Sequence, residues 1–197
     1  MKKLIVLLSA TLLGCLPFAV SAEGGYFGAS FGSTEIVLDG VSAGAGTTID
    51  DEDSGYKIYG GYNVNENFAL EGGYVDFGEV SLNAPTGAQF TVAGTLLQSL
   101  VNINATSSGD AFTFAGVGKM NLGGASIFGK VGLAMWDTET TSNIAALNGS
   151  DDGTDVFFGF GVDVPVMDTL VARFEYEMYE LGDDEVDMMS LGLHLAF

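Results

Sequence analysis

The chain has 197 residues, of which 26 are acidic and only 6 are basic, so its net charge is −20. This charge argues against binding nucleic acid or anionic lipid through basic patches. Hydrophobic residues nevertheless make up 47% of the chain and the mean hydropathy is positive, which excludes an acidic disordered protein.

The N-terminal segment has the features of a secretory signal peptide. Two lysines precede an apolar run from Leu4 to Leu16, and Ala22 ends a group of small residues suited to a signal peptidase. We therefore expect residues 1–22 to be a leader and residues 23–197 to form a single domain. Removing the leader takes away two lysines and no acid, so the remaining chain is more acidic still.

Cys15 is the only cysteine of the chain, and it lies inside this leader. The residues before it loosely resemble a lipoprotein box, so lipoprotein processing stays as an alternative. The bulky Leu13 and the better cleavage site downstream disfavour that alternative. After cleavage at Ala22 neither a disulfide nor thiol chemistry is expected.

Eight segments after the leader alternate in hydrophobicity and are rich in Gly, Tyr and Phe. Alternation with period two predicts β-strands, and a tilted strand needs about 9–11 residues to cross a bilayer. The predicted strands are Gly25–Ser33, Ser54–Val64, Asn67–Gly78, Asp110–Asn121, Ala125–Asp137, Thr154–Val164, Thr169–Glu180 and Glu185–Phe197.

The connections between these strands alternate in length. Short turns are predicted at residues 65–66, 122–124 and 165–168, and the connections on the other side are Thr34–Asp53, Glu79–Gly109, Thr138–Gly153 and the short Leu181–Asp184. Outer-membrane barrels carry their long loops on the cell exterior. We therefore expect both termini to lie in the periplasm, because the number of strands is even.

The segment Thr91–Ile103 within the second long connection is ambiguous. Its apolar residues recur at helical spacing, for example at Val92, Leu96 and Leu100. We interpret the segment as a helical turn or a strand extension inside the loop. The alternative is a lid or adhesive element that contacts a partner or the outer leaflet.

The C-terminal strand has one strongly apolar face. Every second residue from the end is large and apolar, while the intervening residues are mostly small or polar; the apolar series is Phe197, Leu195, Leu193, Leu191 and Met189. A soluble sheet rarely leaves such an edge in water. A strand that closes a barrel in lipid presents this face to the bilayer.

Several short runs together resemble the OmpA-type family of eight-stranded transmembrane barrels. They are Phe68-Ala69-Leu70-Glu71-Gly72-Gly73-Tyr74, Gly116-Val117-Gly118-Lys119, Gly129-Lys130-Val131-Gly132 with Trp136-Asp137, Arg173-Phe174-Glu175-Tyr176, and Ser190-Leu191-Gly192-Leu193 before Phe197. Their order and spacing, more than any one run, carry the resemblance over the whole chain after the leader.

The resemblance implies an all-β, antiparallel up-and-down barrel in the outer membrane of a Gram-negative bacterium. It also implies partners: outer-membrane lipid, lipopolysaccharide, and an assembly machinery that reads Phe197 with the alternate residues Leu195 and Leu193. We expect a monomer without a cofactor. Because no peptidoglycan-binding domain follows Phe197, tethering to the cell wall is not implied.

The basic residues outside the leader all fall inside predicted strands, on the face opposite the bulky apolar residues. Four acids share this inward parity, so the two groups balance: Lys57, Lys119, Lys130 and Arg173 against Glu71, Asp163, Glu175 and Glu177. Unpaired charges in a narrow barrel are costly, which predicts an interior charge network. The resemblance implies a similar network at Glu71, Lys119, Asp163 and Arg173. We interpret the network as a plug, with a gate as the alternative.

Acidic clusters fall near the predicted outer loops. The weak candidates for calcium ligands are Asp50, Asp51, Asp53, Asp183 and Asp184. None of the clusters has EF-hand spacing, and we favour a solvated, repulsive surface.

No catalytic constellation is found. His194, the only histidine, points inward near the end of the chain, whereas lipid A deacylase barrels use a His and a Ser that face the outer leaflet. We therefore expect a structural or surface-interaction role. A small or gated pore is the first alternative, and a lipid-modifying enzyme is the second.

Overall fold

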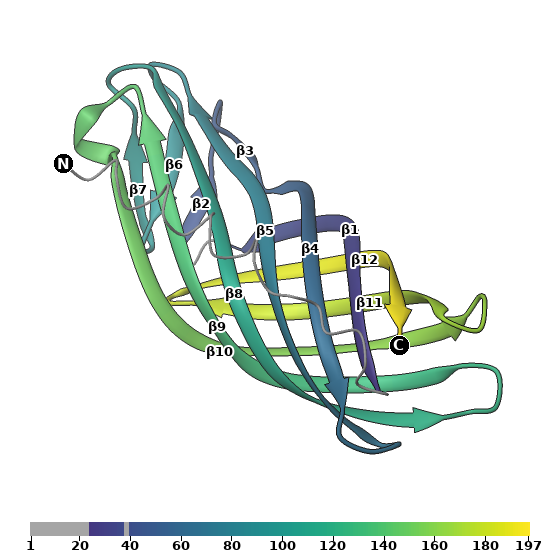
Figure 1. Ribbon diagram of the computed structural model, residues 1–197. Helices are drawn as coiled ribbons and strands as arrows, with labels where there is room; N and C mark the ends of the chain where they lie inside the picture. Colours follow the sequence, from purple (N-terminus) through teal and green to yellow (C-terminus); the bar gives the residue numbers. More distant parts are fainter. Residues whose placement is uncertain (1–23, 38–39) are drawn as a thin grey trace.

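The computed structural model describes residues 24–37 and 40–197, and eight long antiparallel strands form a closed barrel there (Figure 1). The expected leader, residues 1–22, lies outside the described residues. The barrel strands are β1 (Gly25–Val37), β4 (Glu52–Asn63), β5 (Phe68–Ala84), β8 (Ile103–Asn121), β9 (Ser126–Ser142), β10 (Gly149–Pro165), β11 (Leu170–Leu181) and β12 (Asp184–Ala196). The predicted fold class is confirmed.

The ring is closed by the pairing of its first and last strands, β1 and β12, with Phe31 opposite Leu191. Each other barrel strand pairs with the next one along the chain; β5, for example, pairs with β8, with Gly72 opposite Phe114. Closure satisfies the backbone N–H and C=O groups of every strand, which hydrocarbon cannot do. The ring can therefore cross a bilayer without an open edge.

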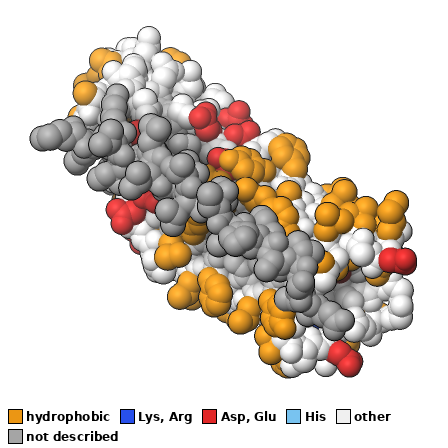
Figure 2. All heavy atoms as spheres, in the orientation of Figure 1, with side chains coloured by type: hydrophobic (Ala, Val, Ile, Leu, Met, Phe, Trp, Pro, Cys, Tyr) orange, Lys and Arg blue, Asp and Glu red, His pale blue; other side chains and the backbone are white. Residues whose placement is uncertain are grey.

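The alternation predicted for the last strand is present in β12. Leu191 points outward and is 65% exposed, whereas Ser190 and His194 are buried in the lumen. Figure 2 shows hydrophobic side chains gathered over the barrel wall, with groups of acidic side chains at the borders of this apolar area. The wall therefore presents an apolar surface to its surroundings.

A row of carboxylates marks one edge of this apolar surface. Asp76, Asp110, Asp137 and Asp152 are paired across β5, β8, β9 and β10, so they lie at one level. From this row, β8 continues toward the β8–β9 connection, and its segment from Phe112 to Met120 carries outward-facing apolar side chains. That distance matches the roughly 9–11 residues a strand needs to cross a bilayer.

The strands on one side of the barrel continue past this row. β5, β9 and β10 have 17 residues each and β8 has 19, whereas β1 and β12 have 13. We call the end reached by these extensions the extended end, and the end with both described chain termini the terminal end. The predicted loops Glu79–Gly109 and Thr138–Gly153 were wrong in this respect, because much of each is strand. Beyond the bilayer neither face of a strand has to be apolar, so the sequence of these extensions shows no period-two alternation of apolar and polar residues.

Short strands cover part of the extended end. β2 (Val41–Ala43), β6 (Gln89–Val92) and β7 (Thr95–Gln98) form a separate small sheet, β3 (Thr48–Asp50) pairs with β5, and η2 (Ala145–Leu147) is a single 3-10 turn. The described residues contain no helix long and apolar enough to cross a membrane.

The segment Thr91–Ile103 therefore does not contain the predicted helical turn. It contains part of a β-hairpin in which Ala93 and Gly94 both have positive φ, 48° and 76°. Two positive φ values in a two-residue connection are typical of the type I′ turn, whose twist suits a hairpin. The strand-extension interpretation is closer to the structure.

Candidate functional site: the lumen and the extended end

Arg173 on β11 lies at the centre of the lumen and is 0% exposed. Its Nε and Nη2 donate to the two carboxylate oxygens of Asp163 on β10, at 2.8 and 3.0 Å. Its Nη1 donates to Glu71 Oε2 on β5, at 2.6 Å. A two-pronged guanidinium–carboxylate pair has a fixed geometry and strong hydrogen bonds. Arg173 thus joins two neighbouring strands to one across the lumen.

Two buried lysines extend this network. Lys130 Nζ on β9 lies 3.1 Å from Glu71, 2.5 Å from Glu175 and 2.6 Å from Glu177. Lys57 Nζ on β4 contacts the same two β11 glutamates, Glu175 and Glu177, the latter at 2.7 Å. Seven of the eight predicted charges therefore meet in one cluster that connects β4, β5, β9, β10 and β11.

Lys119 lies apart from this cluster. Its Nζ donates to Asn63 Oδ1 at 2.9 Å and lies 4.5 Å from the centroid of the Tyr26 ring. Within the described residues it forms no ion pair. The structure therefore does not join Lys119 to the predicted network with Glu71, Asp163 and Arg173, because an amide and an aromatic ring hold its ammonium group.

Aromatic rings surround the guanidinium of Arg173. Its Cζ lies 4.4 Å from the ring centroid of Phe128 and 4.8 Å from that of Tyr59, distances typical of cation–π contacts. The hydroxyl of Tyr26 donates to Glu71 Oε2 at 2.9 Å. Tyr26, Tyr59 and Phe128 were not among the predicted site residues, although their inward parity on the predicted strands was a signal for them.

An apolar layer separates the charge network from the extended end. Tyr179 stacks on Phe157 with ring centroids 5.0 Å apart and meets Phe77 edge-on at 4.8 Å. Trp136, Leu181, Val186 and Met188 pack in the same buried cluster. The lumen is thus filled by an apolar layer on the side of the extended end and a charged layer on the side of the terminal end.

His194 lies in the lumen near the terminal end. It is buried, and its Nδ1 lies 3.3 Å from the hydroxyl of Tyr59. The Tyr26 ring lies 5.2 Å away, measured between centroids. His194 therefore packs among aromatic rings and faces away from the lipid.

The candidate calcium ligands do not come together. The described residues hold no group of three or more His, Cys, Asp or Glu side chains that suits a metal ion. Asp53 Oδ2 instead accepts the backbone N–H of Glu79 at 2.8 Å. Backbone N–H groups of Ser54 and Glu79 hold the pKa of the Asp53 carboxyl below its usual value. The structure gives Asp50, Asp51, Asp53, Asp183 and Asp184 no geometry for calcium.

The extended end carries exposed apolar side chains outside the membrane-facing belt. Leu96 on β7 is 62% exposed and Leu100, just after it, is 85% exposed. Leu97 and Val101 are exposed as well. We call these four residues the exposed apolar segment.

A closed ring of eight tilted strands, with an apolar outer belt and a charged lumen, defines an outer-membrane β-barrel. The family model for the OmpA-like transmembrane domain matches residues 21–193. The chain belongs to this family, whose members lie in the outer membrane of Gram-negative bacteria. A comparison with curated protein sequences finds no match.

Solved structures with the same fold include Ail, the attachment invasion locus protein of Yersinia pestis, and Neisserial surface protein A. Ail of Yersinia pestis, in complex with the heparin analogue sucrose octasulfate, is 18% identical with a TM-score of 0.54, over 89% of this chain and 100% of Ail. Neisserial surface protein A is 12% identical with a TM-score of 0.52, over 88% of this chain and 97% of that protein. At these identities the likeness concerns the fold.

Proposed function

We propose that the protein is a non-enzymatic outer-membrane barrel that anchors a surface-interaction element and contributes to membrane integrity. The observation that carries this proposal is the exposed apolar segment at the extended end. Water-exposed protein surfaces rarely carry several large apolar side chains side by side unless these form an interaction site. Leu96, Leu97, Leu100 and Val101 lie beyond the carboxylate row, so lipid does not explain them.

The filled lumen favours a function located at the ends of the barrel over transport through it. An eight-stranded barrel is just wide enough to be filled by its own side chains. Here Tyr179, Phe157 and Phe77 fill one level and the Arg173 cluster fills the next. A gated pore is the second candidate, because charges with several partners, such as those of Lys130, can exchange them.

The proposed orientation places the extended end outside the cell and both termini in the periplasm. The partners are then outer-membrane lipid and lipopolysaccharide around the belt, and the barrel assembly machinery at the C-terminal strand. We propose a monomer, since the closed ring leaves no strand edge along the belt for a second copy.

The outer end of this chain suits a different ligand from the one in the Ail complex. Sucrose octasulfate is a polyanion, whereas the four Lys and Arg residues in the described part of this chain all lie within the lumen, below the apolar layer or beside it. We therefore propose that polyanion binding is not the role of this protein.

The proposal is tested with cells that display the barrel. We expect the double variant Leu96→Ser/Leu100→Ser to reduce adhesion to hydrophobic beads several-fold, since burial of these side chains drives such contacts. Leu147→Ser is the matched control, because Leu147 is also exposed at the extended end but lies in another connection.

Cysteine labelling of intact cells shows that each variant is displayed in the proposed orientation. Cysteines at Gly46 and Ser150 should react with an impermeant reagent, and those at Asn65 and Gly123 should not. The reverse pattern would overturn the orientation. Equal adhesion of the double variant and the control, at equal display, would overturn the surface-interaction role.

A further inference from the structure

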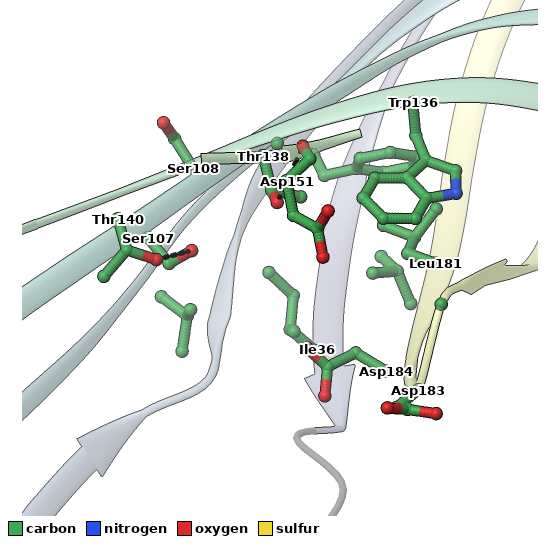
Figure 3. Close-up of a pocket in the computed structure, with 15 residues that line it drawn as sticks. Ile36, Ser107, Ser108, Trp136, Thr138, Thr140, Asp151, Leu181, Asp183 and Asp184 are labelled. Carbon is green, nitrogen blue, oxygen red and sulfur yellow. Dashed lines mark hydrogen bonds between the residues drawn. The ribbon is translucent and has the colours of Figure 1, made fainter. Parts of the chain in front are cut away.

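A cavity of about 380 Å³ opens at the mouth of the barrel, at the extended end. Its size falls within the range of ligand pockets, roughly 300–1,000 Å³. Its lining residues come from β1, β5, β8, β9, β10, β11, β12 and the β11–β12 turn, and Figure 3 shows them around the open volume.

The floor of the cavity is apolar and rigid. Trp136, 6% exposed, lies there with Phe77, Leu181 and Val186. The indole N–H of Trp136 donates to Asp155 Oδ2 at 2.8 Å, and the same oxygen accepts the N–H of Gly182 at 3.1 Å. The indole is therefore fixed in place, and the β11–β12 turn is fixed to it.

Glycine makes room for this indole. A Cβ atom at Gly153 would lie 2.6 Å from Cζ2 of Trp136, closer than real contacts allow. The ring therefore lies flat over the backbone of β10 and leaves the volume above it open.

The wall and rim of the cavity are polar. Thr140 Oγ1 donates to Ser107 Oγ at 3.1 Å across the β8–β9 pair, and Thr138 lies beside Asp151. Figure 3 shows the carboxylate of Asp151 extending from the wall toward the open volume, with Asp183 on the turn opposite. No Lys, Arg or His is among the described residues that line the cavity. The charged side chains of this described lining are therefore all acidic.

We propose that this cavity binds the side chain of a lysine or arginine presented by a protein or peptide at the cell surface. The aliphatic stem of such a side chain would pack on Trp136 and Val186, while its charged head reached Asp151. An anion would be repelled. An uncharged apolar ligand would cover the floor without using the carboxylate.

A bare metal ion fits less well. The described residues bring no three metal-ligating side chains together, and an ion would make no use of the apolar floor. The combination of an apolar floor, hydroxyl groups and a carboxylate favours an amphipathic cation.

This inference rests on the proposed function, because it names a ligand class for the end that faces outward. Trp136 is the only tryptophan of the chain, so its fluorescence reports on this cavity alone. The purified full chain in nanodiscs is titrated with the peptide acetyl-Leu-Arg-Leu-amide. The comparison peptide carries citrulline, which is neutral and close in shape, in place of arginine.

We expect saturable quenching or enhancement with the arginine peptide and about tenfold weaker binding in Asp151→Asn, the loss typical of one charge-assisted hydrogen bond. Asp50→Asn, at the same end but outside the cavity, should bind normally. Migration in unboiled gels shows that each variant is folded.

Equal binding of the citrulline peptide would overturn the proposal, as would equal weakening in Asp151→Asn and Asp50→Asn or the absence of saturable binding. The measurement does not depend on the exposed apolar segment or on the orientation in cells. Its failure is therefore distinguishable from failure of the proposed function.

Discussion

At the scale of single residues, the charges of the lumen depend on one another. Arg173 forms hydrogen bonds with both Asp163 and Glu71 and is enclosed by aromatic rings. Desolvating these groups is costly, and replacing such a pair by apolar residues is often neutral. Removing only one partner is different, because the remaining charge stays buried and uncompensated.

We predict that Arg173→Met lowers the free energy of unfolding by about 3–5 kcal/mol, the usual cost of removing one partner of a buried pair. The folded barrel should then lose its fast migration in unboiled gels at a lower temperature. Lys119→Met is the matched control with a smaller expected loss, because Lys119 contacts an amide and a ring but no carboxylate. A heat resistance of Arg173→Met no lower than that of Lys119→Met would show that the network does not hold the barrel.

At the scale of elements, the seam between β1 and β12 closes the ring. Gly32 on β1 lies so close to β12 that a Cβ atom there would be 2.0 Å from the carbonyl oxygen of Met189. At Gly116 on β8, by contrast, a Cβ atom would meet nothing within 4 Å. The backbone at Gly32 therefore leaves no room for a side chain, whereas the backbone at Gly116 does.

We predict that Gly32→Ala destabilises the barrel by about 1–3 kcal/mol, the typical cost of overpacking. Gly116→Ala should be nearly neutral. Thermal unfolding in detergent, followed by circular dichroism, measures both. Equal effects of the two substitutions would contradict the close approach at the seam.

Phe197 is attached to the other end of this seam. Its backbone N–H donates to the carbonyl oxygen of Gly25, and its own carbonyl accepts the N–H of Gly24, both at 2.9 Å. Phe197→Ala keeps these backbone bonds and removes only the ring. We predict a lower outer-membrane yield in cells with normal refolding of the purified chain into detergent. A normal yield in cells would show that the ring is not an assembly signal.

Alternation along the strands explains how much of this was predictable. It placed Lys57, Lys130 and Arg173 inside the barrel, because each has bulky apolar neighbours on the opposite face. It could not identify Asn63 and Tyr26 as the partners of Lys119, since those contacts depend on register and on packing across the lumen.

Alternation did not predict the extensions of the strands beyond the bilayer, for a related reason. Past the bilayer neither face of β8 or β9 has to be apolar, so residues such as Ser107 and Thr140 give no period-two signal. In the same region Val92, Leu96 and Leu100 matched a helical spacing by coincidence, although they belong to a hairpin and the segment after it. The extensions of β8 and β9 line the cavity at the mouth.

At the scale of the whole molecule, the structure is a wall of apolar residues around a filled lumen, with an acidic mouth at one end. The apolar layer of Phe77, Phe157 and Tyr179 lies directly above the charge network. Water and ions would have to cross both layers. The proposed function assigns the role of such a closed barrel to its surfaces, whereas the gated pore requires that the charged partners exchange.

Conductance across a planar bilayer tests this account most directly. We predict that the purified wild-type barrel produces no steady openings, because the two packed layers leave no continuous aqueous path. If Arg173→Met conducts, we expect its heat resistance to fall as well, because the substitution damages the plug. Steady, reproducible openings of the wild-type barrel, or raised conductance of Arg173→Met with unchanged heat resistance, would contradict the closed lumen and favour the gate.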